Sequence, residues 1–531
     1  MKYDVIVVGG GIAGLTSAAF LCKSGYKVLL CEKEDKLGGL VGSFDYKGFT
    51  FDAGIRALEN SGILFPMIKQ LDLDIEFLPN PVSIGIEKDM IAIDSKNSLL
   101  TYEQMLHRQF PGEEKSIKSL IKTMIKIMDY MDILYGIENP LFMNLKDPEY
   151  LLKTLLPWSF KYLSKVSKIT PFNIPTNSYM KTITENQVLI DVIGQHFFKD
   201  TPAFFALSYF SLYLDYKYPK GGTGTLISEM AKYIESHGGE IKTDTRIVST
   251  NAADRAITDH IGNTMEFDEM VWAADSKTLY AQISDIDRFP MKISDKIKER
   301  HDFLSDKVGG DSVLSLYLTV DLDKAYFENI SNPHVFYTPE KIGLSTLPLE
   351  RIKDNQGLYI DSSEPIFNWL REFFKITTYE ISIPVLRDES LAPKGKTGLI
   401  VSTLLDYSLV KHIEKMGWYD AFKLLCQEEI SSSLIHSIYP KLEGHIIDGF
   451  VSTPLTIEKR TGNSDGAITG WAFTNDTMPA VSSMPKIAKS IETPIPHIVQ
   501  AGQWSYSPAG LPISILTGKL AADHVEKELK D

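Results

Sequence analysis

The chain has 531 residues, of which 44% are hydrophobic and 23% charged, and its formal net charge is −14 at pH 7. This length predicts about two to four domains, and the composition is that of an ordinary globular protein. The acidic balance argues against a nucleic-acid partner, because binding phosphates requires a surplus of Lys and Arg. No apolar run reaches the roughly 18 residues that a membrane-spanning helix needs.

The three cysteines, Cys22, Cys31 and Cys426, form no C-x-x-C pair. We therefore expect buried, unreactive thiols in a reducing compartment. We also expect no signal peptide, since the N-terminus leads directly into an apolar strand. These features predict a cytoplasmic protein that is at most peripheral to a membrane.

The N-terminal segment has the order of elements that a dinucleotide site requires. Gly9, Gly11 and Gly14 stand in G-x-G-x-x-G spacing between a strand at 4–8 and an Ala-rich helical pattern. In this motif the first glycine permits a tight turn, the second admits a pyrophosphate and the third lets helix and strand pack closely. The helix N-terminus directs unpaired N–H groups at the phosphates.

A second strand at 27–30 leads to Glu32, which lies 21 residues after Gly11. A carboxylate at about this offset accepts hydrogen bonds from ribose hydroxyls, and its charge disfavours a 2′-phosphate. Gly38 and Gly39 follow in a turn that would wrap the pyrophosphate. The order of these elements indicates a dinucleotide site.

Beyond this unit, residues 60–215 have a mostly helical pattern rich in Met, Phe, Tyr and Leu. A strand is predicted at 241–249, after a glycine-rich turn and a helix. Further strands are predicted at 312–320, 379–385 and 398–404. Because dinucleotide-type elements occur at the start, middle and end of the chain, we expect one binding domain assembled from separated segments.

The C-terminal segment narrows the choice of cofactor. Gly510, Leu511 and Pro512 precede a helix predicted from about 514 to 528. A helix starting beside Gly510 would offer N–H groups and the positive end of its dipole to an electron-rich ring edge. A flavin gains negative charge on its O2/N1 side when reduced, so this placement suits a flavin.

At these positions the chain resembles the FAD-dependent phytoene desaturase, carotenoid isomerase and retinol saturase group of the amine oxidase superfamily. Besides the residues above, the resemblance rests on Phe51–Gly54, Pro219–Gly222, Tyr379–Pro384 and Ala501–Pro512. It spans nearly the full length and implies FAD as cofactor. The retinol saturase branch tends to have Ile-His where this chain has Ile55-Arg56, which leaves the branch open.

The chain pattern and the resemblance predict an α/β fold. A Rossmann-like FAD-binding domain would combine residues 1–60, 216–280 and 450–531, beside an α+β substrate domain from 61–215 and 281–449. The predicted cofactor-binding residues are Gly9, Gly11, Ile12, Ala13, Gly14, Glu32, Lys33, Gly38, Gly39, Val248, Gly502, Gly510, Leu511 and Pro512.

Arg56 and Trp504 are the predicted catalytic residues. Arg56 follows the flavin-side glycine, where a cation would stabilise an anionic reduced ring. A structural ion pair with a nearby carboxylate is the alternative. Trp504 and Tyr506 would wall the ring or the substrate, with core packing as the alternative.

A candidate acid or base is found among Glu380, Arg387 and Asp388. We favour the alternative that all three are solvent-exposed charges in a loop. The eleven histidines show no metal-ligand spacing, and we expect no metal. The absence of a G-x-S-x-G motif argues against a serine hydrolase.

Residues 151–184 contain no acidic residue, within a chain that is acidic overall. The lysines of this stretch are Lys153, Lys161, Lys165, Lys168 and Lys181, and its large apolar residues include Leu155, Leu156, Trp158, Phe160 and Tyr162. Lysines beside interfacial aromatic residues suit a membrane surface, with domain packing as the alternative.

We expect hydride transfer to or from flavin N5 on a long apolar polyene or isoprenoid lipid, by desaturation, saturation or flavin-assisted isomerisation. Two alternatives stay open. The first is an amine oxidase-like enzyme acting on a C–N bond, and the second is a flavin-binding scaffold without turnover. The sequence leaves the electron acceptor, the direction of the reaction and the oligomeric state open.

Overall fold

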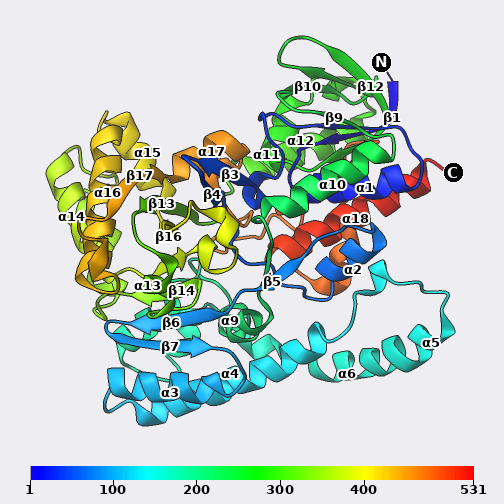
Figure 1. The fold of residues 1–531 in the computed structure, drawn as a ribbon. Helices are drawn as coiled ribbons and strands as arrows, with labels where there is room; N and C mark the ends of the chain where they lie inside the picture. Colours follow the sequence, from blue (N-terminus) through cyan, green and yellow to red (C-terminus); the bar gives the residue numbers. More distant parts are fainter. Residues whose placement is uncertain (1, 167, 531) are drawn as a thin grey trace.

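Two seven-stranded sheets organise the chain (Figure 1). The computed structural model describes residues 2–166 and 168–530. The strands of the first sheet are β1 (Lys2–Val8), β2 (Val28–Cys31), β9 (Glu240–Lys242), β10 (Ile247–Asn251), β11 (Ala256–Asp259), β12 (Thr264–Trp272) and β18 (Ile498–Gln500). Their order is β10-β11-β12-β1-β2-β9, and β18 also pairs with β12.

The first sheet is covered on both faces, which explains why its central strands are almost wholly apolar. Strand β1 pairs in parallel with β2 and β12, and β9 and β18 extend the parallel part. One face packs against α1 (Ile12–Lys23), α10 (Gly224–Ser236) and α18 (Leu511–Glu528). The other face packs against α11 (Ser276–Gln282) and α12 (Met291–Ser305). The predicted α/β, Rossmann-like fold class is confirmed.

The second sheet is mostly antiparallel and has the character of the predicted α+β part. Its strands are β6 (Val82–Ile86), β7 (Asp89–Ile93), β13 (Ser312–Val320), β14 (His334–Thr338), β15 (Tyr379–Ser382), β16 (Thr397–Leu405) and β17 (Ile446–Ser452). Their order is β17-β13-β16-β15-β14-β6-β7. One face of this sheet packs against α14 (Ser363–Ile376), α15 (Tyr407–Lys415) and α16 (Tyr419–His436).

A helical layer covers the β6–β7 end of the second sheet. Its main helices are α3 (Ser98–Gln109), α4 (Glu114–Leu134), α8 (Gln187–Gly194) and α9 (Ala203–Asp215). Helices α5 (Pro148–Tyr150) and α6 (Leu156–Val166) lie along the lower edge of the molecule, away from both sheets (Figure 1). Smaller helices are α2 (Leu64–Gln70), α7 (Thr176–Met180), α13 (Lys324–Glu328) and α17 (Pro454–Thr461).

Three sequence predictions need correction. The region 60–215 holds β6, β7 and β5 (Phe77–Pro79) as well as helices, because short apolar runs do not distinguish strand from helix. The strand predicted at 241–249 divides into β9 and β10, and Asp244 between them has a φ of 49°. The strand predicted at 379–385 ends at Ser382, and a 3-10 turn begins at Pro384, whose ring nitrogen has no hydrogen to donate.

The predicted domain limits near residues 60 and 450 stay a prediction. Two elements close to these limits pack with the neighbouring domain. Helix α2 contributes Leu64 and Met67 to the core under the first sheet. Strand β17 pairs with β13 in the second sheet.

Asp52 is the polar link between the sheets. It ends the hairpin of β3 (Ser43–Tyr46) and β4 (Phe49–Asp52), which packs on the second sheet through Phe51 and Tyr317. The Asp52 carboxylate is fully buried and accepts hydrogen bonds from the Tyr218 hydroxyl at 2.8 Å and from the Thr223 N–H and hydroxyl, both at 2.9 Å. These donors belong to β8 (Lys217–Pro219) and the turn that starts α10. Asp52 therefore joins the hairpin to the segment that enters the first sheet.

We predict that Asp52→Ala lowers the free energy of unfolding by at least about 3 kcal/mol, because it leaves three buried donors without an acceptor. Urea denaturation measures the change. Asp45→Ala is the matched control, since Asp45 is an exposed residue of the same hairpin and should change stability by less than about 0.5 kcal/mol. Equal losses in the two variants would contradict the prediction.

Candidate functional site

A cavity of about 740 Å³ lies between the carboxyl ends of the parallel strands and the second sheet. In open α/β sheets this edge is where ligands bind. The cavity brings together most residues predicted from the sequence: Gly9, Gly11, Ile12, Ala13, Glu32, Lys33, Gly38, Gly39, Arg56, Gly502, Trp504, Gly510 and Leu511. Three others, Gly14, Val248 and Pro512, do not line it.

Each of the three glycines of the motif is needed for a different structural reason. A Cβ on Gly9, whose φ is 110°, would lie 2.6 Å from the Ala273 carbonyl oxygen. A Cβ on Gly14 would lie 1.9 Å from the Gly9 carbonyl oxygen, so Gly14 serves helix–strand packing. A Cβ on Gly11 would meet no protein atom within 4 Å, because Gly11 faces the cavity. This geometry reserves the space beside Gly11 for a ligand.

Glu32 stands at the end of β2 on the cavity wall. Its carboxylate accepts hydrogen bonds from the Gly10 N–H at 2.7 Å and the Glu34 N–H at 3.0 Å. Burial raises the pKa of Glu32 despite these bonds. The side chain is thereby fixed, and both oxygens keep a lone pair for ribose hydroxyls.

Val248 was the wrong residue of its strand. Its side chain is 42% exposed, whereas Ile247 next to it lines the cavity together with Thr245 and Arg246. Successive residues of a strand point to opposite faces, so an error of one position moves a predicted contact to solvent. The division of the predicted strand into β9 and β10 caused this error.

The C-terminal segment forms another part of the wall. Gly502, with a φ of 94°, donates its N–H to the Thr517 hydroxyl at 2.9 Å. Gly510 is the N-cap of α18 and lines the cavity with Leu511, while Pro512 lies in the first turn of the helix, behind the wall. Helix α18 therefore directs its N-terminus at the cavity, as predicted.

Trp504 both lines the cavity and packs in the core. It is 2% exposed, and its ring lies 4.8 Å from that of Trp471 in an edge-to-face arrangement. Its Nε1 donates to Asn463 at 3.3 Å. Tyr506 is equally buried and is not part of the lining. Tyr506 therefore packs in the core, as the alternative prediction had it. Trp504 packs in the core and also forms part of the cavity wall.

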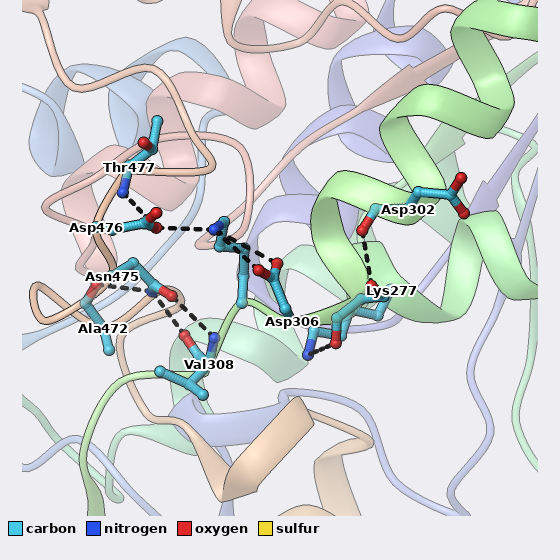
Figure 2. A network of polar contacts seen from close by, with 10 residues as sticks. Lys277, Asp302, Asp306, Val308, Ala472, Asn475, Asp476 and Thr477 are labelled. Atoms are coloured by element: carbon cyan, nitrogen blue, oxygen red, sulfur yellow. Dashed lines mark hydrogen bonds and ion pairs between the residues drawn. The ribbon is translucent and has the colours of Figure 1, made fainter.

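A polar network holds the loop that carries Trp471. Asn475 accepts from the Val308 N–H at 3.0 Å and donates to the Val308 carbonyl at 2.9 Å (Figure 2). The adjacent Asp476 contacts the Lys307 ammonium at 2.8 Å. The network ties this loop to the segment that leads into β13, and so fixes the position of Trp471 beneath Trp504.

Arg56 lies at the opposite end of the cavity from Glu32, on the second sheet. It is 3% exposed, and its Nη1 lies 3.3 Å from a Glu380 carboxylate oxygen. The same carboxylate lies 3.0 Å from Nε2 of His334. Arg56 Nη2 also donates to Ser402 and Ser315, while Nε has no hydrogen-bond partner among the described residues. Arg56 therefore forms the ion pair that was the alternative prediction, with Glu380 as its partner, and both residues line the cavity.

The prediction of solvated loop charges at 380–388 was wrong. Glu380 stands on β15 and lines the cavity, and burial acts to raise its pKa, but Arg56, His334 and Arg387 outweigh burial and hold the pKa at about 2. Arg387 donates to Asn80 at 2.6 Å and to Ser382 at 3.0 Å. The sequence signal was a charged residue inside an apolar strand pattern.

Asp388 is also more buried than a solvated charge would be, at 8% exposed. Its carboxylate accepts from the Gly221 N–H at 2.8 Å. It thus holds the glycine turn of 219–222 in place.

Glu59 is a site residue that the sequence analysis missed. It lines the cavity three residues after Arg56, and burial, followed by the weaker effect of Asp215, raises its pKa to about 7. A carboxyl with a pKa near neutrality in a cavity is a candidate proton donor and acceptor. Nothing in the sequence motif marked it, because its pKa depends on burial in the folded chain and on Asp215, which is distant in sequence.

The cavity between Arg56 and Glu59 is walled by large aromatic and apolar side chains. These residues are Phe197, Phe198, Phe205, Tyr209, Leu212, Tyr216 and Phe336, from α9, β14 and the connecting segments. Burial lowers the pKa of His334, which keeps its ring neutral at pH 7. The cavity therefore has a glycine-lined end with N–H groups and a wide aromatic end with few charges.

Comparisons with known proteins agree with this architecture. A family model described as an NAD(P)-binding Rossmann-like domain matches residues 7–71. Relatives include the inactive all-trans-retinol 13,14-reductase of Danio rerio, 28% identical over 45% of this chain and 40% of that protein. Prolycopene isomerase 2 of an Oncidium hybrid is 22% identical over 88% of this chain and 75% of that protein. The all-trans-retinol 13,14-reductase of Rattus norvegicus is 23% identical over 94% of this chain and 82% of that protein.

Among solved structures, putrescine oxidase bound to putrescine has a TM-score of 0.61 at 13% identity, covering 99% of each chain. At this identity the likeness shows a shared fold. The relatives agree with the predicted group of carotenoid isomerases and retinol saturases and with the predicted oxidoreductase class. The flavin cofactor stays a prediction. Within the described ranges, no helix combines the length and apolarity needed to cross a bilayer.

We predict that Gly11→Val nearly abolishes flavin retention without unfolding the protein. The Gly11 φ of −75° suits any residue, and the added side chain would enter the space reserved for the ligand. Flavin content is read from visible absorbance and folding from circular dichroism. Gly14→Val, by contrast, should disrupt the fold itself, since its Cβ would clash with backbone.

Glu32→Ala should lower flavin retention less severely than Gly11→Val, because backbone contacts to the phosphates would persist. Unchanged flavin content in both the Gly11→Val and Glu32→Ala variants would overturn the assignment of this end of the cavity.

We also predict a pH dependence from Glu59. Its folded pKa of about 7 exceeds the value of 4.5 expected when exposed, so its contribution to stability is present below about pH 4.5 and is lost as pH rises through 7. From pH 5 to pH 8 the wild type should lose about 2 kcal/mol relative to Glu59→Gln. Urea denaturation of both proteins at the two pH values tests this, and a constant difference would refute it.

Proposed function

We propose that the protein is an FAD-dependent oxidoreductase that acts on a long apolar polyene or isoprenoid lipid, by desaturation, saturation or flavin-assisted isomerisation. The observation that carries the proposal is the cavity itself, which joins a dinucleotide-type end at Gly11 and Glu32 to an aromatic end at Tyr216 and Phe336. Its three buried, free cysteines agree with a cytoplasmic, reducing location.

The residues present fit FAD rather than a smaller flavin. The space beside Gly11 and the N–H groups at the start of α1 would hold a pyrophosphate, and Glu32 would accept the ribose hydroxyls. The N-terminus of α18 at Gly510 would face the flavin ring. When bound, FAD supplies hydride acceptance or donation at this site.

The aromatic end suits a substrate with few polar groups. Phe205, Leu212 and Phe336 would bury an extended hydrocarbon and exclude water from the reacting carbon. The Glu59 carboxyl, with a pKa near 7, would accept the proton lost in desaturation or donate the proton gained in saturation. Glu380 stays ionised at neutral pH, so its role is to balance the charge of Arg56.

An amine substrate is the second candidate. Glu59 beside the rings of Tyr209 and Tyr216 offers a carboxyl and aromatic faces, which together attract a cation. Against this, the Arg56 guanidinium lines the same cavity, and its positive charge is unfavourable for a neighbouring ammonium group. A flavin-binding scaffold is the third candidate, since one relative is named as inactive.

Anaerobic mixing of the purified holoprotein with substrates separates these candidates. We expect a polyene such as prolycopene or all-trans-retinol to bleach the flavin absorbance, or to give a saturated or isomerised product when the flavin is first reduced with dithionite. Chromatography identifies the product. Bleaching by putrescine or another amine alone would favour the second candidate, and no change with either class of compound would favour the third.

Glu59→Gln tests the proton-transfer role within the same assay. We expect turnover to fall about a hundredfold with flavin content unchanged, because general acid–base catalysis contributes roughly that factor. Glu414→Gln on α15 is the matched control, since Glu414 is an exposed glutamate paired with Lys411. Undiminished turnover in Glu59→Gln would remove Glu59 from the mechanism.

A further inference from the structure

The helix at 148–166 has an apolar face that no described part of the chain covers. Helix α5, a π-helical turn at Leu151–Leu155 and α6 follow one another without a break. Leu152, Leu156, Phe160 and Leu163 are 66%, 49%, 68% and 67% exposed. Their spacing of four, four and three residues places them on one side of the helix. We refer to these four side chains as the α6 apolar face.

The opposite side of α6 holds it firmly on the protein. Trp158 Nε1 donates to the Ile133 carbonyl at the end of α4, at 2.6 Å. Tyr162, one turn further along α6, stacks on the Trp158 ring with centroids 5.0 Å apart and so keeps that ring on the same side of the helix. The exposure of the α6 apolar face is therefore a consequence of how α6 is docked.

After Glu149, every charged residue up to position 184 is a lysine. Lys153 pairs with Glu149 at 2.8 Å, whereas Lys161, Lys165 and Lys168 form no ion pair with any described residue. No acidic residue occurs from 150 to 184. A helix with an apolar face flanked by unpaired lysines matches a surface that is apolar beneath and anionic at its boundary.

We propose that the α6 apolar face docks on a membrane surface that contains anionic lipids, with Phe160 and Leu163 among the acyl chains and the lysines at the headgroups. A second copy of this chain fits less well, because a twofold contact through α6 would bring the same lysines together. Figure 1 shows α6 along an edge of the molecule, where it can lie flat on such a surface.

The inner side of α6 lies close to the substrate cavity. Burial, Glu59 of the cavity wall and Tyr162 of α6 all raise the pKa of Tyr135, which follows the end of α4, to about 12. Docking itself does not depend on turnover.

Co-sedimentation of the holoprotein with vesicles tests the proposal. We expect binding to vesicles of phosphatidylcholine with phosphatidylglycerol, and at least tenfold weaker binding by the variant with Phe160→Ser and Leu163→Ser. Lys161→Gln with Lys165→Gln should weaken binding to these vesicles several-fold and leave binding to pure phosphatidylcholine unchanged. Leu424→Ser is the control, since Leu424 is 63% exposed on α16, and it should bind as the wild type does.

Two results would overturn the proposal. The first is equal sedimentation of the wild type and the Ser double variant. The second is a wild-type dimer in light scattering that the Ser double variant converts to a monomer without any vesicle binding. Flavin content and circular dichroism check that each variant is folded, and the lysine variant carries the test if the Ser variant fails this check. Absent vesicle binding would leave the substrate assay unaffected, so the two proposals fail separately.

Discussion

The buried carboxylate of Asp52 joins parts of the chain that are far apart in sequence. It accepts hydrogen bonds from Tyr218 and Thr223, more than 160 residues later, while its own hairpin packs on the second sheet. Because a buried charge is tolerated only when its hydrogen-bonding capacity is satisfied, these contacts admit little variation in geometry. These hydrogen bonds therefore help to set the relative position of the two sheets that bound the cavity.

The cavity divides its chemistry between its two walls. The first sheet contributes backbone, through Gly9, Gly11 and the starts of α1 and α18, and we propose that these groups recognise the cofactor by close approach. The second sheet and α9 contribute side chains, mostly aromatic, with Arg56 and Glu380 balancing one another. An enzyme built in this way can change its substrate through the second wall while the cofactor wall stays the same.

The cofactor wall was largely predictable from the sequence, because local backbone requirements determine it. Glycine spacing, flanking strands and the offset of Glu32 are local patterns with one structural solution. Val248 shows the limit, since one residue of register reverses the face of a strand. Glu59 and Glu380 could not be assigned, because their pKa values depend on Asp215, Arg56 and His334, which only the tertiary structure brings near. Strand β6 was missed for a related reason, since its parallel partner β14 is distant in sequence, and β7 joins the sheet only through β6.

The first and last helices of the chain are packed together unusually closely. Ser17 of α1 donates to the Gly518 carbonyl of α18 at 2.9 Å, and a Cβ on Gly518 would lie 2.5 Å from the Ala13 carbonyl oxygen. Because 501 residues separate Ser17 from Gly518, α1 leaves the ribosome long before its partner, and one apolar side of the nascent nucleotide unit has no cover until α18 has been made. Any cofactor held between these two helices would consequently be taken up only once both have been synthesised.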